Sequence, residues 1–438
     1  MKLNDRLKKL DKYPFHMPGH KRNGKFGIIG SEIDITEIDG FDNLHNPKDC
    51  LLELEERFAS IYNCKKSIIS INGTTCGILA TISAICNKGD KIIIARNCHK
   101  SVYNACFINQ LRVEYIYPCT VSEFNCFGQI TQSQIDDAVK NHPDAKAIVI
   151  TSPTYEGIVS SIESPIPLIV DCAHGAHFVC SNDFPAYPKA DIVISSLHKT
   201  LPALTQSAVV NIYNEKYIYD IKKYMDIYET SSPSYVLLSS IEKCADFVEN
   251  NKCNCYIELL RQFRSNVIAL ENIEILDNDD ISRICIKSKT LNGNQLADIL
   301  RNEYNIEPEM SCNDYVILIS TVADDKYAID MLFDALKGVN NCCHNKFEFV
   351  SLSYTKPEKA KESFEVDSNF HETKLDDALN NICAEYVYAY PPGIPILVPG
   401  EIIDKNIIDY IKNCIDNNTN IISDSGLLPH KILTNGKV

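Results

Sequence analysis

The chain has 438 residues, more than one ordinary hydrophobic core holds, so we expect a large domain with one or two smaller ones. Hydrophobic residues make up 45% and charged residues 23%, which is typical of a globular protein. The formal net charge of −15 argues against nucleic acid or an anionic membrane as a partner.

The first twelve residues and the cysteines bear on location and metal binding. Residues 1–12 are charged and lack an apolar segment, so no signal peptide is expected, and no run reaches the roughly 18 apolar residues of a membrane span. The 19 cysteines are scattered through apolar segments, which is typical of the reducing cytoplasm. The clusters at 253–255 and 342–344 lack a second half at zinc-site spacing, so no metal is expected.

The N-terminal part is rich in loops. Residues 15–22 include His16 and His20, which cannot share a helix face because a Pro-Gly pair separates them, so a metal pair is not expected there. Residues 39–47 form a second loop, and residues 51–62 predict an amphipathic helix.

From residue 67 onward, short β-branched runs alternate with helical patterns, as in residues 77–86. This alternation predicts an α/β fold with a mostly parallel sheet covered on both faces. The predicted strands are residues 67–71, 91–95, 145–150, 167–170 and 191–195.

Polar clusters follow all five strands, at the edge where open α/β sheets bind ligands. Asn72-Gly73-Thr74-Thr75 opens a helix, and its backbone N–H groups and two hydroxyls suit a phosphate, although a threonine N-cap explains it equally. His99 could stack on a cofactor ring or be an ordinary hydrogen-bonding side chain.

Two residues point to pyridoxal phosphate. Asp171 ends an apolar strand and needs a cationic or donor partner; a protonated pyridine nitrogen would serve, as would a helix cap or an internal salt bridge. Lys199 follows the strand at 191–195, where partial desolvation favours Schiff-base chemistry, although many lysines after strands are ordinary surface residues.

Further along, residues 236–264 predict a long helical connection, and residues 273–339 predict a small α/β domain. Its strands are expected at 283–286 and 315–319, and its helices at 293–303 and 325–337; residues 340–345 look like a linker. The predicted domains are a loop-rich segment at 1–50, a large cofactor-binding domain at 51–264, a small α/β domain at 265–340 and a C-terminal α+β domain at 341–438.

Seven ordered stretches resemble the motifs of the Orn/Lys/Arg decarboxylase family: residues 15–21, 37–47, 72–77, 97–101, 152–157, 171–177 and 196–199. Residues 390–395 and 399–401 resemble that family's C-terminal domain, so the resemblance spans almost the whole chain. It implies a pyridoxal-phosphate enzyme with the aspartate-aminotransferase fold (fold type I).

The resemblance also implies roles for single residues. Lys199 would carry the cofactor covalently, Asp171 would pair with the ring nitrogen, and His99 and Ala173 would cover the two ring faces. The phosphate would be held by Thr74, Thr75, Ser196 and His198, and the substrate side would be lined by Thr154 or His174. Ser232 lies in residues 230–235, which match a segment that reaches a partner's cofactor phosphate, so an obligate homodimer with active sites at its interface is implied.

The chain departs from the family pattern at two positions. Cys172 stands where the family often has Glu, and Cys76 where it often has Ser or Thr; neither change removes a group that the chemistry requires. No receiver-like domain fits before residue 15, so we expect a short member that does not form acid-regulated decamers.

The expected activity is decarboxylation of arginine, lysine or ornithine to agmatine or a diamine, as in polyamine biosynthesis. Lys199, His198 or His174 would return a proton to Cα. Glu309 and Glu401 could contact the cationic end of the substrate, or be solvated surface carboxylates.

Two alternatives remain. One is an aminotransferase or carbon–sulfur lyase of the same fold, for which Arg283 could clamp the α-carboxylate. The other is a catalytically silent relative that acts by binding; intact Lys199, Asp171 and His99 argue against it.

Overall fold

The structure is a computed structural model that describes residues 2–250, 253–341, 356–389, 393–416 and 420–437. The chain divides into two compact units, each described by itself. The first unit contains residues 1–85, 163–255 and 321–323, and the second contains residues 86–162, 256–320 and 324–438.

The first unit holds four sheet strands in the order β1-β9-β8-β7. These are β1 (Lys66–Ser70), β9 (Ala208–Ile212), β8 (Ile192–Ser196) and β7 (Leu168–Asp171). β7 and β8 are parallel, and β9 is antiparallel to both β8 and β1. Because Ser70 and Ser196 both pair with Ala208, β1 and β8 end at the same level.

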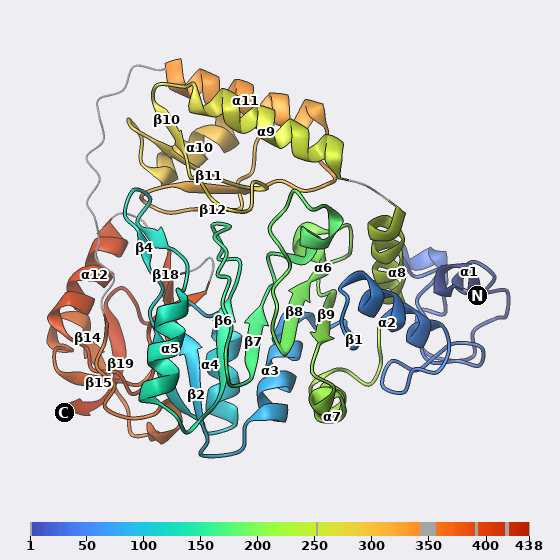
Figure 1. Cartoon of the computed structure of the whole chain (residues 1–438), viewed down its shortest axis with the longest axis horizontal. Coiled ribbons are helices and arrows are strands. Elements are labelled where there is room, and N and C mark those ends of the chain that lie inside the picture. Colours follow the sequence, from blue (N-terminus) through green and yellow to red (C-terminus); the bar gives the residue numbers. More distant parts are fainter. Residues whose placement is uncertain (1, 251–252, 342–355, 390–392, 417–419, 438) are drawn as a thin grey trace. The chain divides into compact units, whose positions relative to one another are not determined.

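Helix α3 (Gly73–Ile85) packs against β8 and β9, and α7 (Ile218–Tyr228) lies beside it (Figure 1). Gly77 permits this close approach, because a Cβ there would lie 2.7 Å from Val210 Cγ2 and 3.1 Å from Ile194 Cγ2. The remaining helices of the unit are α1 (Leu3–Leu7), α2 (Cys50–Ile61), the short α6 (Leu197–Thr200) and α8 (Tyr235–Asn250).

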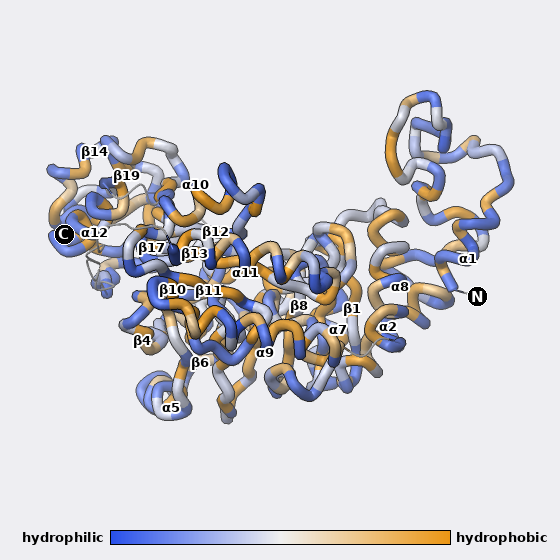
Figure 2. The backbone as a smooth tube through the Cα atoms, turned by 90° about the horizontal axis from the view of Figure 1, so that it is seen from above, coloured by the Kyte–Doolittle hydropathy of each residue, from blue (hydrophilic) through white to orange (hydrophobic). Residues whose placement is uncertain are grey.

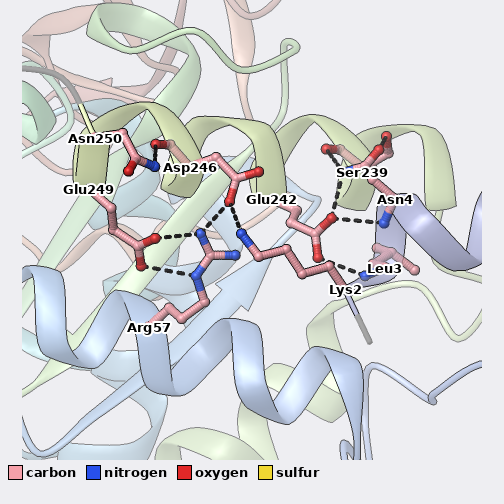
Figure 3. A network of polar contacts seen from close by, with 9 residues as sticks. All are labelled: Lys2, Leu3, Asn4, Arg57, Ser239, Glu242, Asp246, Glu249 and Asn250. Carbon is pink, nitrogen blue, oxygen red and sulfur yellow. Dashed lines mark hydrogen bonds and ion pairs between the residues drawn. The ribbon is translucent and has the colours of Figure 1, made fainter.

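Helix α8 anchors both α1 and α2 (Figure 3). The buried carboxylate of Glu242 accepts the backbone N–H groups of Leu3 and Asn4, each at 2.7 Å, which satisfies N–H groups at the start of α1. Arg57 of α2 pairs with Glu249 at 2.7 Å. Figure 2 shows polar and apolar residues alternating along α2, as the amphipathic pattern predicted for residues 51–62 requires, and the same alternation along α8.

In the second unit, three parallel strands are ordered β6-β2-β3. They are β6 (Ala145–Thr151), β2 (Lys91–Ala95) and β3 (Arg112–Ile116), with helices α4 (Lys100–Ile108) and α5 (Gln132–Asn141). The hairpin of β4 (Thr120–Val121) and β5 (Cys126–Phe127) follows β3.

The second unit also contains the small α/β sheet, in the order β10-β11-β13-β12. Its strands are β10 (Ile273–Ile275), β11 (Arg283–Ser288), β12 (Met310–Ser311) and β13 (Val316–Ile319). The helices here are α9 (Asn254–Ile268), α10 (Gly293–Tyr304) and α11 (Lys326–Asn341).

The C-terminal part forms two three-stranded sheets, β14-β19-β15 and β17-β16-β18. The strands are β14 (His371–Lys374), β15 (Asn381–Cys383), β16 (Val387–Ala389), β17 (Ile394–Leu397), β18 (Ile421–Ser423) and β19 (Lys431–Lys437), with helix α12 (Lys405–Asp416).

Short 3-10 turns occur along the whole chain, at Gly24–Phe26, Ala176–Cys180, Glu215–Tyr217, Ser363–Glu365 and Leu375–Asp377.

The predicted α/β class with mostly parallel strands is confirmed, and the five strands predicted between residues 67 and 195 agree with the structure to within one residue at each end. The two strands predicted in the small domain correspond to β13 and to β11, which runs two residues further than predicted. The predicted connection at 236–264 is two helices, α8 and α9. Helix α11 runs to Asn341, while residues 342–345 of the predicted linker, the cluster at 342–344 and residues 390–392 of the C-terminal motif lie outside the described residues. Among the helices that the structure describes, none has the length and apolar character needed to cross a membrane.

Candidate active site

Lys199 lies in α6, one turn after the buried strand β8 ends. Its side chain is half-buried, and its Nζ lies 3.1 Å from Nε2 of His174. His174 itself is 7% exposed. The primary amine therefore has a buried imidazole within direct proton-transfer distance.

Asp171 is the last residue of β7, and it is buried. Its Oδ1 accepts the backbone N–H of Ala173 at 3.1 Å. Burial raises the pKa of Asp171, while the positive charge of Lys199 and the Ala173 hydrogen bond oppose that rise. A buried carboxylate within electrostatic reach of Lys199 is suited to a cationic N–H donor.

Ser196 and His198 lie on either side of the β8–α6 junction. Ser196 is fully buried, and its Oγ lies 3.1 Å from Nδ1 of His198. The same Nδ1 lies 3.1 Å from the carbonyl oxygen of Ser207, which only accepts, so Nδ1 carries the proton. Burial, together with the charge of Lys199, lowers the pKa of His198, although the bond to Ser207 opposes this. His198 is therefore neutral at neutral pH.

Thr74 and Thr75 lie in the first turn of α3. Backbone N–H groups and the positive end of the helix dipole face outward there. Gly73 has φ +73°, which the turn requires. The level of this turn is fixed by Glu229, whose buried carboxylate accepts the N–H of Ile71 at 2.7 Å and the hydroxyl of Ser70 at 3.0 Å.

The structure brings these residues to one edge. β1, β7 and β8 run in the same direction, so Thr74, Asp171, Ser196 and Lys199 all lie at or just beyond the carboxyl ends of strands in the first unit. Ser232 also belongs to this unit; it is exposed, and its N–H donates to the hydroxyl of Thr230 at 3.2 Å.

His99 and Thr154 belong to the second unit. His99 is the N-cap of α4, and its Nδ1 accepts the N–H of Ser101 at 3.2 Å, so the neutral ring carries its proton on Nε2. Thr154 is buried and its Oγ1 accepts the N–H of Ile158 at 3.3 Å. Each follows the carboxyl end of its strand, β2 or β6, as the sequence predicts.

Of three further candidates, Glu309 agrees with the surface-carboxylate reading because it is exposed, whereas Glu401 and Arg283 are buried. Glu401 is not a solvated surface carboxylate: it is 1% exposed and its Oε2 lies 3.1 Å from Nη2 of the fully buried Arg96. Glu309 is exposed and accepts the hydroxyl of Tyr155 at 2.7 Å. Arg283 begins an interior strand of the small sheet and is fully buried, with its Cβ packed against Gly157.

Sequence reasoning assigned no role to His45, Arg96, Ser207 or Glu229, although each holds part of the site or of a neighbouring loop. His45 lies inside the motif at residues 37–47 and Arg96 directly precedes the motif at residues 97–101, so their proximity to those motifs was the available signal. Glu229 ends an amphipathic helix and resembles any solvent-facing glutamate in sequence.

Two family models match the chain. The model described as Orn/Lys/Arg decarboxylase, major domain, matches residues 6–289, and the model for the C-terminal domain of the same enzymes matches residues 340–421. The chain belongs to the Orn/Lys/Arg decarboxylase family. The resemblance predicted from the seven motifs is thereby confirmed.

Named relatives agree with this family. An arginine decarboxylase of Bacillus subtilis is 29% identical, with 92% of this chain and 90% of the relative covered. A lysine decarboxylase of Hafnia alvei is 22% identical over 91% of this chain and 71% of the relative. The uncharacterized protein YaaO of Bacillus subtilis is 28% identical over 93% of this chain and 92% of its own length.

Solved structures show the same fold. The constitutive lysine decarboxylase of E. coli superposes with a TM-score of 0.81 at 17% identity, covering 99% of this chain and 81% of that one. An alanine–glyoxylate aminotransferase from Nostoc superposes with a TM-score of 0.55 at 14% identity, covering 70% of this chain and 89% of that one. This decarboxylase is a pyridoxal-phosphate-dependent carboxy-lyase with fold type I.

The side chains of the first unit fit this cofactor chemically. Lys199 offers the primary amine that an aldehyde requires, Asp171 offers a buried acceptor for a protonated ring nitrogen, and the first turn of α3 offers N–H groups for a phosphate. The donor set therefore matches the aldehyde, the ring nitrogen and the phosphate of the cofactor.

Proposed function

We propose that this chain decarboxylates a basic amino acid, with arginine, giving agmatine, as the favoured substrate and lysine and ornithine as the alternatives. The observation that carries the proposal is the Lys199–His174 contact at the edge where Asp171 also ends its strand. Support for arginine comes from the four relatives named arginine decarboxylase, which match at 28–29% identity, whereas those named lysine decarboxylase match at 22–26%.

Bound at this site, pyridoxal phosphate supplies an electron sink for the bond between Cα and the leaving carboxylate. Lys199 carries it covalently and Asp171 keeps a proton on its ring nitrogen. Thr74, Thr75, Ser196 and, from a second copy, Ser232 hold the phosphate, with the neutral His198 beside them. The family resemblance assigns Ala173 and His99 to the two faces of the cofactor ring.

The protein also shields the reacting carboxylate from solvent and returns a proton to Cα. Strands β7 and β8 are buried throughout, so Asp171 and Ser196 at their ends are shielded from solvent. Conversion of a charged carboxylate into neutral CO₂, by breaking its bond to Cα, is favoured in such surroundings. Lys199 Nζ and His174 Nε2 are close enough to share a proton, and we assign to this pair the return of the proton to Cα. Thr154 lines the substrate side.

We further propose that the protein works as a cytoplasmic homodimer with the active sites at the subunit interface, in the biosynthesis of polyamines. The support is the match of residues 230–235 to the family segment that reaches a partner's cofactor, together with the exposure of Ser231 and Ser232 in the single chain. Sedimentation of the purified protein tests the dimer.

The test of the activity is incubation of purified protein with arginine, lysine and ornithine in separate reactions, with CO₂, amine and keto acid measured. We expect CO₂ and amine in equal amounts from one of the three and none from Lys199→Ala. Lys216→Ala, at an exposed lysine outside the site, is the control and should keep full activity. Keto acid without CO₂ would indicate an aminotransferase and overturn the proposal.

A further inference from the structure

His45 lies in the loop at residues 37–47, and its two ring nitrogens contact α7 and the segment that follows α7. Nδ1 lies 2.9 Å from Oδ1 of Asp226, and Nε2 lies 2.8 Å from the backbone carbonyl oxygen of Thr230. The loop is held on the same helix by Lys222, whose Nζ donates to the His45 carbonyl at 2.5 Å. The ring thus bridges α7 and the segment that follows it.

The two contacts determine the charge of the ring. A carboxylate and a carbonyl only accept hydrogen bonds, and a neutral imidazole has a single N–H, so both bonds form only when both ring nitrogens carry protons. The charged groups that face the ring are Asp226 and Glu229, which are negative, and Lys222, which is positive and itself lies 3.4 Å from Asp226.

The pKa of His45 shifts in the direction that favours this doubly protonated ring. Burial by itself lowers the pKa of His45, but the hydrogen bonds to Thr230 and Asp226 and the charges of Asp226 and Glu229 outweigh it, and the pKa is raised. His45 is therefore protonated over a wider pH range than an ordinary histidine.

Thr230 is held from two sides. Its carbonyl is held by His45, and the preceding residue, Glu229, is tied to Ile71 and Ser70 at the end of β1, just before the phosphate-binding turn. The exposed residues Ser231 and Ser232 follow directly. Without the bond to His45, Thr230 loses its tie to the loop at residues 37–47, and the exposed residues Ser231 and Ser232 can then move between Glu229 and the buried Pro233.

We propose that His45, as a doubly protonated imidazolium, is a positioning residue that holds residues 230–233 for cofactor binding and releases them when it loses a proton. This inference rests on the proposed function, because the contact of Ser232 with the cofactor of a second copy belongs to that proposal. A group whose pKa is raised on folding contributes fully below its ordinary pKa, about 6.5, and its contribution is lost as pH rises through the raised value.

The test measures the dissociation constant of pyridoxal phosphate, by absorbance, for the wild type and His45→Gln between pH 6 and 9. Because cofactor binding to the wild type also depends on pH, the quantity compared is the dissociation constant of His45→Gln divided by that of the wild type at each pH. We expect His45→Gln to bind about tenfold more weakly at pH 6 and about equally at pH 9. His45→Lys, a fixed cation with donors for both acceptors, should keep tight binding at both pH values.

His142→Gln is the matched control, since His142 is also a partly exposed histidine near a carboxylate, Glu114 at 3.8 Å, and lies in the second unit. Its ratio should stay near one throughout. A ratio for His45→Gln that does not change with pH overturns the inference, as does an NMR titration of His45 at or below the ordinary pKa. Both readouts are independent of the amino acid decarboxylated. A failure of the role proposed for His45 is therefore distinguishable from a failure of the proposed activity.

Discussion

Nε2 of His174 lies 3.1 Å from Nζ of Lys199, and both side chains belong to the same unit of the chain. This contact distinguishes His174 from His198, whose Nδ1 is engaged by the Ser207 carbonyl. The two histidines, which the sequence left as equal candidates for proton transfer, therefore have different expected roles.

We predict that His174→Gln lowers kcat for CO₂ release by about 10²-fold, the lower end of what a positioned acid–base group contributes, while the cofactor stays bound. His198→Gln should mainly weaken cofactor binding and leave kcat at saturating cofactor within a few-fold. The two are compared by steady-state kinetics and cofactor titration. Equal losses of kcat in both variants would remove the distinction.

Asp171→Asn should lower kcat by about 10²-fold or more, because an uncharged amide does not keep the ring nitrogen protonated. In the cofactor-free chain, the same substitution should increase the free energy of unfolding. Burial raises the pKa of Asp171, so its carboxyl favours folding at pH below its ordinary pKa of about 4, and this contribution is lost as pH rises through the raised value.

Urea unfolding of the cofactor-free proteins measures this second effect. The Asn variant should be more stable than the wild type at pH 7, and the difference should shrink toward pH 4. A variant less stable than the wild type at pH 7 would show that the Ala173 hydrogen bond and the charge of Lys199 outweigh the cost of burying the carboxylate.

Gly77→Ala should destabilise the first unit, because the new methyl group meets Val210 Cγ2 at 2.7 Å across the α3–β9 contact. We expect a loss of about 1–3 kcal/mol in the free energy of unfolding and weaker cofactor binding, since Thr74 and Thr75 move with the helix. Gly19→Ala, where nothing lies within 4 Å of the new atom, is the control and should be neutral in both assays. Unchanged cofactor affinity in Gly77→Ala would mean that the start of α3 is not part of the site.

The buried pair of Arg96 and Glu401 predicts a large cost when one charge is left alone. Glu401→Ala should lose about 3–5 kcal/mol of unfolding free energy, because Arg96 stays in a fully buried position without that carboxylate. Glu309→Ala, at an exposed carboxylate, should cost about 1 kcal/mol or less. Denaturant unfolding compares the two, and similar small losses would show that water solvates the Arg96 site.

The positions of the strands whose apolar runs end in polar residues could be predicted from the sequence. Asp171 and Lys199, for example, lie at or just after the ends of strands whose bounds agree with the prediction to within one residue. The sequence did not yield the direction of β9, because an apolar run reads the same in parallel and antiparallel strands. The connection from Ser196 to Ala208 was a usable signal: it is too short for an ordinary parallel crossover.

The nature of Glu401 could not be read from sequence for another reason. Its burial depends on Arg96, which is about 300 residues away in the chain, and no local pattern reports a contact at that separation. The same holds for His45, whose partners lie at residues 226 and 230. The chemistry-bearing residues at strand ends were therefore predictable, whereas the residues that hold their loops in place were not.

Borohydride reduction of the purified protein, followed by peptide mass mapping, tests whether Lys199 carries the cofactor in a site completed by Asp171. We predict one pyridoxyl-phosphate adduct per chain, located on Lys199. An adduct on another lysine, with Lys199 unmodified, would contradict it.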